Sequence, residues 1–353
     1  MHAERDQDPS LTAVHVNWTG PHRKGWRRVG LGFREKIQQP YELPAEEIVT
    51  TVHSVLAWRA HHGTIHLLTD DLGRSYAEEQ HLAGLYDRVD TSLNALDSAG
   101  IDPILYPTAG KMFAATLRSA PFAVIDTDLY LRKPLDLGGR HGFGFAHWET
   151  VDNVVYPDPA TLPAPEGVDL SDWKFDTLAA NMAISLFFDD LHRAEYASTA
   201  VDFMRGNSAP YDGLSMARAL FAEQRIAPAA AMARGIELRP VTDRLWKTDE
   251  GLWDGPSYAA EFHHTWHQKH LLRQFPELCP AYLRYLLEDL LWRFPDALEV
   301  LLRIPALTPH HSLIRATRHD LLEHGPTTQW PAAAPGSTPR NRPGSDWRHP
   351  DPA

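Results

Sequence analysis

Cysteine is almost absent from this chain of 353 residues. The single cysteine, Cys279, excludes an intramolecular disulfide and a cysteine-based zinc cluster. Disulfides accumulate in oxidising compartments, so this composition favours a reducing one. The first residues, 1–8, also lack the basic start and the apolar stretch of a signal peptide. We therefore expect a cytoplasmic protein.

Long apolar runs and a surplus of positive charge are missing as well. A membrane-spanning helix needs roughly 20 predominantly apolar residues, and no stretch approaches that length, so no transmembrane segment is expected. Lys and Arg number 34 against 46 Asp and Glu, which gives a net charge of −12. A general nucleic-acid binder neutralises phosphates with excess Lys and Arg, so nucleic acid is not an expected partner. Any phosphate should be reached through a metal ion or a few local cations.

What the chain does contain is an alternation of strand-like and helix-like segments, from residue 11 onward, which is the rhythm of an α/β fold. We expect one catalytic domain over residues 1–272. Tyr282, Leu286, Leu290 and Phe294 recur at helical spacing, which predicts a helical extension over residues 273–324 packed on that domain. Residues 325–353 are rich in Pro without periodicity, which is typical of a disordered tail.

The most informative stretch is an apolar run, residues 122–125, that ends at two carboxylates, Asp126 and Asp128. The run suits a strand covered on both faces, and the two-residue period of extended backbone places both carboxylates on the same side. Two such groups repel each other unless a cation lies between them, and a hard divalent ion is the natural neutraliser. An isolated D-x-D more often opens a turn. Ligands of α/β sheets, however, bind beyond the carboxyl ends of strands, where this pair lies.

Other candidates surround this motif in the sequence. Lys111 lies near the start of a predicted helix over residues 109–119, where a lysine opposes the helix dipole and so lacks a local structural reason. It is a candidate contact for an anion. Asn181 begins a strand-like segment and either binds a ligand or closes a turn. Glu223 and Gln224 form an acidic-amide pair at the end of another predicted helix.

The densest cluster of site-like residues is 261–270, which holds four histidines and a lysine. Residues 258–262 look like a strand, so the cluster falls at a strand end. Imidazole commonly completes a metal site that already has carboxylates. A solvated polar turn is the alternative, since the chain contains 20 histidines.

In this order, the features resemble the GT-A glycosyltransferases. Ile125-Asp126-Thr127-Asp128 looks like their D-x-D motif, and Asn181-Met182-Ala183 is similar to the Asn-Ala-Gly strand of the glycogenin-like members. Residues 263–269 have the spacing of the H-x-x-G-x-x-K loop of the retaining members, although Trp266 replaces its Gly. The resemblance implies a GT-A, Rossmann-like mixed sheet with C-terminal helices, and it covers roughly residues 11–272.

The resemblance also implies an activity and a set of roles. It implies a metal-dependent glycosyltransferase of the hexosyltransferase class that uses a nucleotide-diphosphate sugar as donor. Mn²⁺ or Mg²⁺ would be held by Asp128 with Asp126 and His263. The donor would be bound by Lys111, Asn181, Lys269 and Asp126. Glu223 or Gln224 would face the anomeric centre, and Glu223 or Asp212 would supply the base of an inverting reaction. The acceptor is a saccharide, a small molecule or a protein.

Two other functions stay open at this point. Phosphohydrolases of the haloacid-dehalogenase type also end an apolar strand in D-x-D, but their motif usually follows the first strand of the fold. The second alternative is a non-catalytic domain that binds a nucleotide sugar or a partner protein. The replaced glycines favour this alternative, whereas the intact carboxylate pair opposes it.

Overall fold

The computed structural model describes residues 11–29, 33–36, 39–137, 139–151, 155–156, 158–162, 165, 168–171, 173–207, 216–243, 245–246 and 261–326. Most of the expected disordered tail, 325–353, therefore lies outside the described residues, as does Asp212. Among the helices of the described part, none is both long and apolar enough to cross a membrane.

A seven-stranded sheet forms the centre of the molecule, with the strand order β12-β8-β11-β6-β1-β4-β5. Neighbouring strands are parallel except at β11, which runs antiparallel to both β6 and β8. The strands are β1 (Ala13–Asn17), β4 (Ile65–Thr69), β5 (Arg88–Asp90), β6 (Phe122–Ile125), β8 (Phe143–Phe145), β11 (Ile184–Phe187) and β12 (Leu238–Pro240). The expected mixed sheet is confirmed, and most of its neighbouring strands are parallel.

Three smaller sheets extend the fold. Two lie on the C-terminal side of the main strands, as a three-stranded sheet in the order β10-β9-β13 and a two-stranded pair of β7 with β14. Their bounds are β7 (Leu129–Leu131), β9 (Trp148–Glu149), β10 (Ala179–Ala180), β13 (Leu245–Trp246) and β14 (Phe262–His264). The third is the hairpin of β2 (Trp26–Val29) with β3 (Phe33–Lys36), which follows the short helix α1 (Gly20–Arg23).

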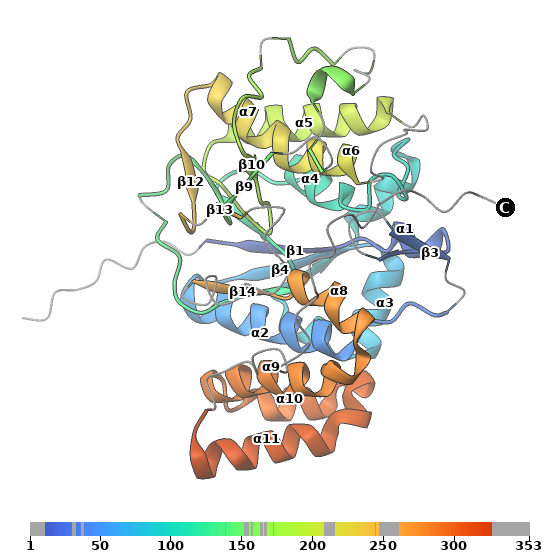
Figure 1. Cartoon of the computed structure of the whole chain (residues 1–353), viewed down its shortest axis with the longest axis vertical. Helices are drawn as coiled ribbons and strands as arrows, with labels where there is room; N and C mark the ends of the chain where they lie inside the picture. Colours follow the sequence, from blue (N-terminus) through green and yellow to red (C-terminus); the bar gives the residue numbers. More distant parts are fainter. Residues whose placement is uncertain are drawn as a thin grey trace, which may run out of the picture.

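Helices cover both faces of the main sheet, and the strands β6, β8 and β11 are buried along their whole length. In Figure 1 α4, α5, α6 and α7 lie above the sheet, and α2 lies below it. Two core clusters correspond to these two faces. The helices are α2 (Ala45–His61), α3 (Asp71–Glu79), α4 (Ala109–Thr116), α5 (Asp190–Gly206), α6 (Ala217–Leu220) and α7 (Ile226–Ala233), with a π-helical turn, η4 (Phe221–Arg225), between the last two.

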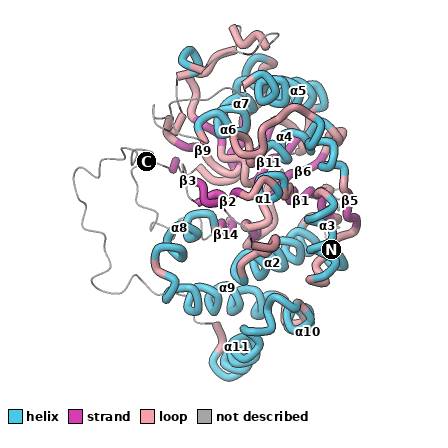
Figure 2. Tube along the Cα trace, turned by 90° about the vertical axis from the view of Figure 1, so that its right-hand side faces the viewer, coloured by secondary structure: helices cyan, strands magenta, loops and turns pink. Residues whose placement is uncertain are grey.

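Three C-terminal helices form an outer layer beneath α2, as both views show (Figures 1 and 2). They are α9 (Cys279–Arg293), α10 (Ala297–Arg303) and α11 (His311–His324), and α8 (Trp266–Gln274) precedes them in the chain. The predicted stripe is buried or half-buried, and Leu286 and Leu290 of α9 share one apolar core with Val52 of α2. The C-terminal helices of the expected fold class are therefore present, while the division at residue 272 stays a prediction.

His53 of α2 makes this core sensitive to acid. Its ring stacks on Tyr130 with 3.6 Å between the ring centroids. Burial lowers the pKa of His53 from 6.5 to about 3. Below pH 6.5 His53 is protonated in the unfolded chain but stays neutral in the folded protein. Its contribution to the free energy of unfolding is therefore fully present above pH 6.5 and is lost as the pH drops toward 3.

We therefore expect the free energy of unfolding to fall by about 2 kcal/mol more between pH 7 and pH 5 in the wild type than in His53→Phe, at 1.36 kcal/mol per unit of pH for one linked proton. Urea unfolding at the two pH values measures the difference. His319→Gln, at an exposed histidine of α11, is the control for the replacement of a histidine outside the core. The same pH dependence in His53→Phe as in the wild type would contradict this assignment.

Candidate metal and donor-binding site

The two predicted carboxylates lie at the carboxyl end of β6, in the middle of the main sheet. Asp126 directly follows the strand, and its backbone N–H donates to the carbonyl of Ala183, the residue before β11, at 2.9 Å. A tight turn through Thr127 then leads to Asp128 and into β7, and the backbone N–H of Leu129 donates to the carbonyl of Asp126 at 3.2 Å. Asp128 is buried, and the Asp126 side chain is 20% exposed. The pair therefore opens toward the strand ends, where ligands of such sheets bind.

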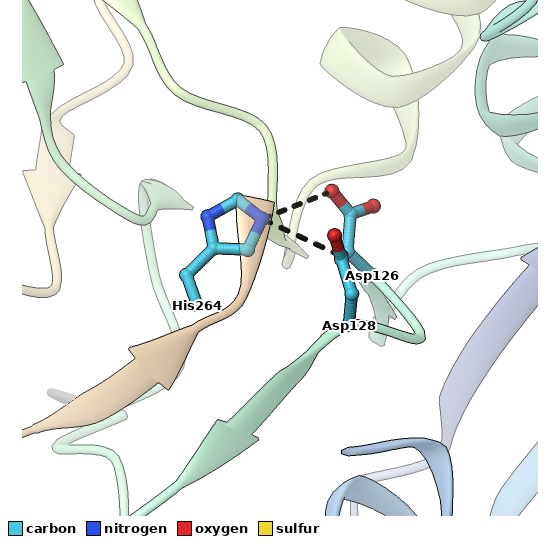
Figure 3. A group of neighbouring side chains, drawn as sticks. All are labelled: Asp126, Asp128 and His264. Atoms are coloured by element: carbon cyan, nitrogen blue, oxygen red, sulfur yellow. Dashed lines mark ion pairs between the residues drawn. The ribbon is translucent and has the colours of Figure 1, made fainter. Parts of the chain in front are cut away.

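His264 of β14 completes the group. β14 pairs antiparallel with β7, and this register places His264 opposite Leu129. Figure 3 shows the His264 ring directed at both carboxylates. Its Nε2 lies 3.4 Å from Oδ1 of Asp128 and 3.9 Å from Oδ2 of Asp126. One ligand atom from each of the three residues falls within 4.8 Å of the others.

The predicted metal ligand His263 lies on the opposite face of β14, which is a correction to the sequence analysis. Its Nε2 lies 2.7 Å from the hydroxyl of Tyr282 on α9, and its ring packs against Tyr130 and Tyr285. Burial lowers the pKa of His263 to about 3. Successive side chains of a strand point to opposite sides, so the described strand over 262–264 turns His264, and not His263, toward the carboxylates.

Each carboxylate of the pair has its own lysine. Lys111 of α4 lies 2.5 Å from Asp126 and 2.8 Å from Glu223. Lys269 of α8 lies 2.9 Å from Asp128 and 3.0 Å from Glu47 of α2. Both lysines, predicted from the sequence, therefore lie at the site. Four carboxylates and two ammonium groups leave an excess of two negative charges, which one divalent cation would neutralise.

The electrostatics of the pair are asymmetric. Burial raises the pKa of Asp126, and Asp128 adds to the rise while Lys111 opposes it. Burial acts in the same direction on Asp128, but Lys269 and His264 outweigh it and hold the pKa of Asp128 well below its usual range. Burial alone would lower the pKa of Lys111, yet Asp126 and Glu223 raise it. Asp128 is therefore the more strongly ionised of the two potential ligands.

Asn181, which precedes β11, belongs to a buried polar network that includes a residue the sequence analysis missed. The missed residue is Glu149 of β9, whose carboxylate accepts a hydrogen bond from Nδ2 of Asn181 at 2.6 Å and another from the hydroxyl of Tyr156. Oδ1 of Asn181 accepts from the backbone of Ala183 at 3.0 Å, so the amide is held at both ends. Burial raises the pKa of Glu149, although its hydrogen bonds oppose the rise. In the sequence, Glu149 is marked only by its position in the Gly-rich stretch 142–150.

Glu223 and Gln224 both lie on the π-helical turn η4, a distortion that is frequent at functional sites. Both side chains are buried. Glu223 contacts Lys111, as described above, whereas Gln224 contacts the hydroxyl of Tyr156 through Oε1. Glu223 is thereby connected to the metal-binding group through Lys111, and Gln224 to the Asn181 network.

The donor set fits a divalent cation. Carboxylate oxygens suit Mg²⁺ and Mn²⁺, and an imidazole is acceptable to Mn²⁺ and the later transition metals. The group leaves coordination positions for oxygens that the protein does not supply. Asp126, Asp128 and His264 are thus the residues that could hold the ion.

No family model matches the chain, and no curated protein matches it. The structure is similar to that of a xylosyltransferase. The match is to the "crystal structure of mouse Xyloside xylosyltransferase 1, apo form", with a TM-score of 0.34 and 11% sequence identity, and it covers 65% of this chain and 84% of that one.

Proposed function

We propose that this protein is a metal-dependent glycosyltransferase that moves a sugar from a nucleoside-diphosphate sugar to an acceptor. The observation that carries the proposal is the group of Asp126, Asp128 and His264 at the carboxyl end of β6, with Lys111 and Lys269 on either side of it. A cation site between two lysines suits a diphosphate, because each ammonium group could contact phosphate oxygens and a bound cation would neutralise further phosphate charge.

The reaction breaks the bond between the anomeric carbon and the diphosphate, so negative charge builds on the phosphate oxygens. A bound Mn²⁺ or Mg²⁺ supplies Lewis-acid stabilisation of that charge. Lys269 is proposed to contact the diphosphate, and Lys111 the phosphates or the sugar. Both ammonium groups lie beside the carboxylates that would hold the cation, which supports this assignment.

The sugar is proposed to lie toward Asn181 and the η4 turn. Glu223 or Gln224 would face the anomeric centre, and Asn181 would donate to sugar hydroxyls. Glu149 holds the side-chain amide of Asn181, and Tyr156 holds that of Gln224. Fixing the amides in advance reduces the entropy cost of ordering them around a substrate. In an inverting reaction Glu223 or Asp212 would accept the proton of the acceptor hydroxyl.

Calorimetric titration with UDP and with GDP, each with and without Mn²⁺, tests the proposal. We expect one of the nucleotides to bind only when Mn²⁺ is present, and the matching nucleotide sugars to be consumed when candidate acceptors are added. Failure of both UDP and GDP to bind in the presence of Mn²⁺ would overturn the proposal. Phosphate release from phosphomonoesters would favour the phosphohydrolase instead, and nucleotide-sugar binding without turnover would favour the non-catalytic domain.

A further inference from the structure

A line of consecutive hydrogen bonds connects His263, which follows Phe262 in β14 and precedes the candidate ligand His264, to the first turn of α2. Nε2 of His263 lies 2.7 Å from the hydroxyl of Tyr282, and that hydroxyl donates to Oγ1 of Thr265 at 3.1 Å. Oγ1 of Thr265 lies 3.1 Å from Oγ1 of Thr50, which donates to the backbone carbonyl of Glu46 at 2.6 Å. Helix α9, strand β14 and helix α2 are thereby joined.

The donor and the acceptor of each hydrogen bond in this line follow from counting the hydroxyl protons. A carbonyl can only accept, so the single hydroxyl proton of Thr50 is committed to Glu46. Thr50 must then accept from Thr265, which must in turn accept from Tyr282. The proton of Tyr282 is thus used as well, and its oxygen can only accept from His263. The ring of His263 is therefore the tautomer that carries its proton on Nε2.

Thr265 connects this line to the site itself. It directly follows His264, and its backbone N–H donates to the carbonyl of Asp128 at 2.8 Å. Its own carbonyl accepts from the backbone N–H of Lys269 at 3.2 Å, at the start of α8. A shift of Thr265 would therefore move the adjacent His264, the backbone carbonyl of Asp128 and the backbone N–H of Lys269. Its side chain is fully buried, as are those of Thr50 and Tyr282, so no water replaces a lost partner without rearrangement.

We propose that Tyr282 and Thr265 are positioning residues of the metal-binding group, and that helix α9 contributes to the site through them. This inference takes one element from the proposed function, namely that the ligand of the group is a divalent cation. Outer partners that orient the ligands of a metal ion typically change its affinity by 10- to 100-fold when they are removed. The C-terminal helices would then be required for cation binding as well as for core packing.

Conservative variants test this. Tyr282→Phe and Thr265→Val each remove one hydroxyl at nearly constant volume, and Thr265→Ser keeps the hydroxyl. Tyr106→Phe is the matched control, because Tyr106 is equally buried and its hydroxyl donates to the backbone of Asn207, at 2.9 Å, outside the line. We expect Mn²⁺ affinity, measured by electron paramagnetic resonance of free Mn²⁺, to fall about tenfold or more in Tyr282→Phe and Thr265→Val, and to stay near the wild-type value in Thr265→Ser and Tyr106→Phe.

Thermal midpoints of all four variants separate positioning from general loss of stability. Equal losses of affinity in Tyr106→Phe and Tyr282→Phe, or no loss in Tyr282→Phe, would overturn the inference.

A second measurement uses the metal-free protein. Nitrogen-detected NMR of the histidine rings, assigned with His263→Gln, should show the Nε2–H tautomer of His263 in the wild type and in Thr265→Ser. The His264 signals should shift in Tyr282→Phe and not in Tyr106→Phe. An Nδ1–H tautomer in the wild type, or unmoved His264 signals, would overturn the inference. If no cation binds, the proposed function fails, whereas these spectra still decide whether the line positions His264.

Discussion

Asp128→Asn is expected to abolish the Mn²⁺-dependent binding of the nucleoside diphosphate and, with it, turnover. The substitution keeps the size of the side chain and removes the more strongly ionised carboxylate of the group. Lewis-acid stabilisation by a metal is worth several kcal/mol, and each 1.36 kcal/mol is a factor of ten in rate, so we expect turnover to fall about a thousandfold or more.

The fold should survive this change. Lys269 loses Asp128 but keeps Glu47 at 3.0 Å, so its charge is not left without a partner. Asp97→Asn is the control, because that carboxylate is 50% exposed and pairs only with Arg23 in the contacts seen for it. Calorimetry with nucleotide and Mn²⁺, together with a thermal midpoint for each variant, measures both effects. If a folded Asp128→Asn protein bound nucleotide and Mn²⁺ as tightly as the wild type, the carboxylate pair would not be the cation site.

Lys111→Met is expected to have the largest effect on stability. Its ammonium group lies between Asp126 and Glu223, and the side chain is 19% exposed, so the variant leaves two carboxylates facing each other in a mostly buried space. Removing one partner of a buried ion pair costs about 3–5 kcal/mol, because the remaining charge keeps its desolvation penalty. We expect a loss of this size in the free energy of unfolding without metal.

Added Mn²⁺ should restore part of that stability, because a cation bound only by the folded protein contributes about 2.7 kcal/mol at a concentration of 100 times its Kd. Lys133→Met is the matched control. That lysine is 54% exposed and pairs with Glu261 at 2.8 Å, so its loss should cost no more than about 0.5 kcal/mol. Urea unfolding of both variants, with and without Mn²⁺, measures the difference. Equal stabilities of the two variants would contradict a buried charge cluster.

The pairing of these charges could not be predicted from the sequence, although the charged residues themselves could. A lysine in the first turn of a helix opposes the dipole, which makes Lys111 unusual in the sequence, and its ion pairs with Asp126 and Glu223 explain its position. Glu223 is more than one hundred residues from Lys111, and only the packing of α4 against η4 brings the two together. Long-range partners of this kind follow from the topology of the fold.

His264 illustrates the same limit within two residues. The expected strand over 258–262 placed His263 first after the strand, whereas the described strand covers Phe262–His264 and pairs with β7. The direction of each side chain alternates along a strand, so a shift of one residue in extent or register exchanges the two histidines. That register is set by the contacts of β14 with β7 and α9, which a local pattern does not contain.

Features that depend on local chemistry can be read from neighbouring residues of the chain. These are the α/β rhythm, the apolar strand that ends at Asp126 and Asp128, and the helical spacing of the apolar residues in α9. Three contacts follow instead from the packing of distant elements: His264 lies beside the two carboxylates, Glu149 accepts a hydrogen bond from Asn181, and Tyr282 donates one to Thr265. Periodicity and strand ends are encoded over a few neighbouring residues, whereas these contacts join side chains from separate elements and exist only once the sheet and its helices have packed.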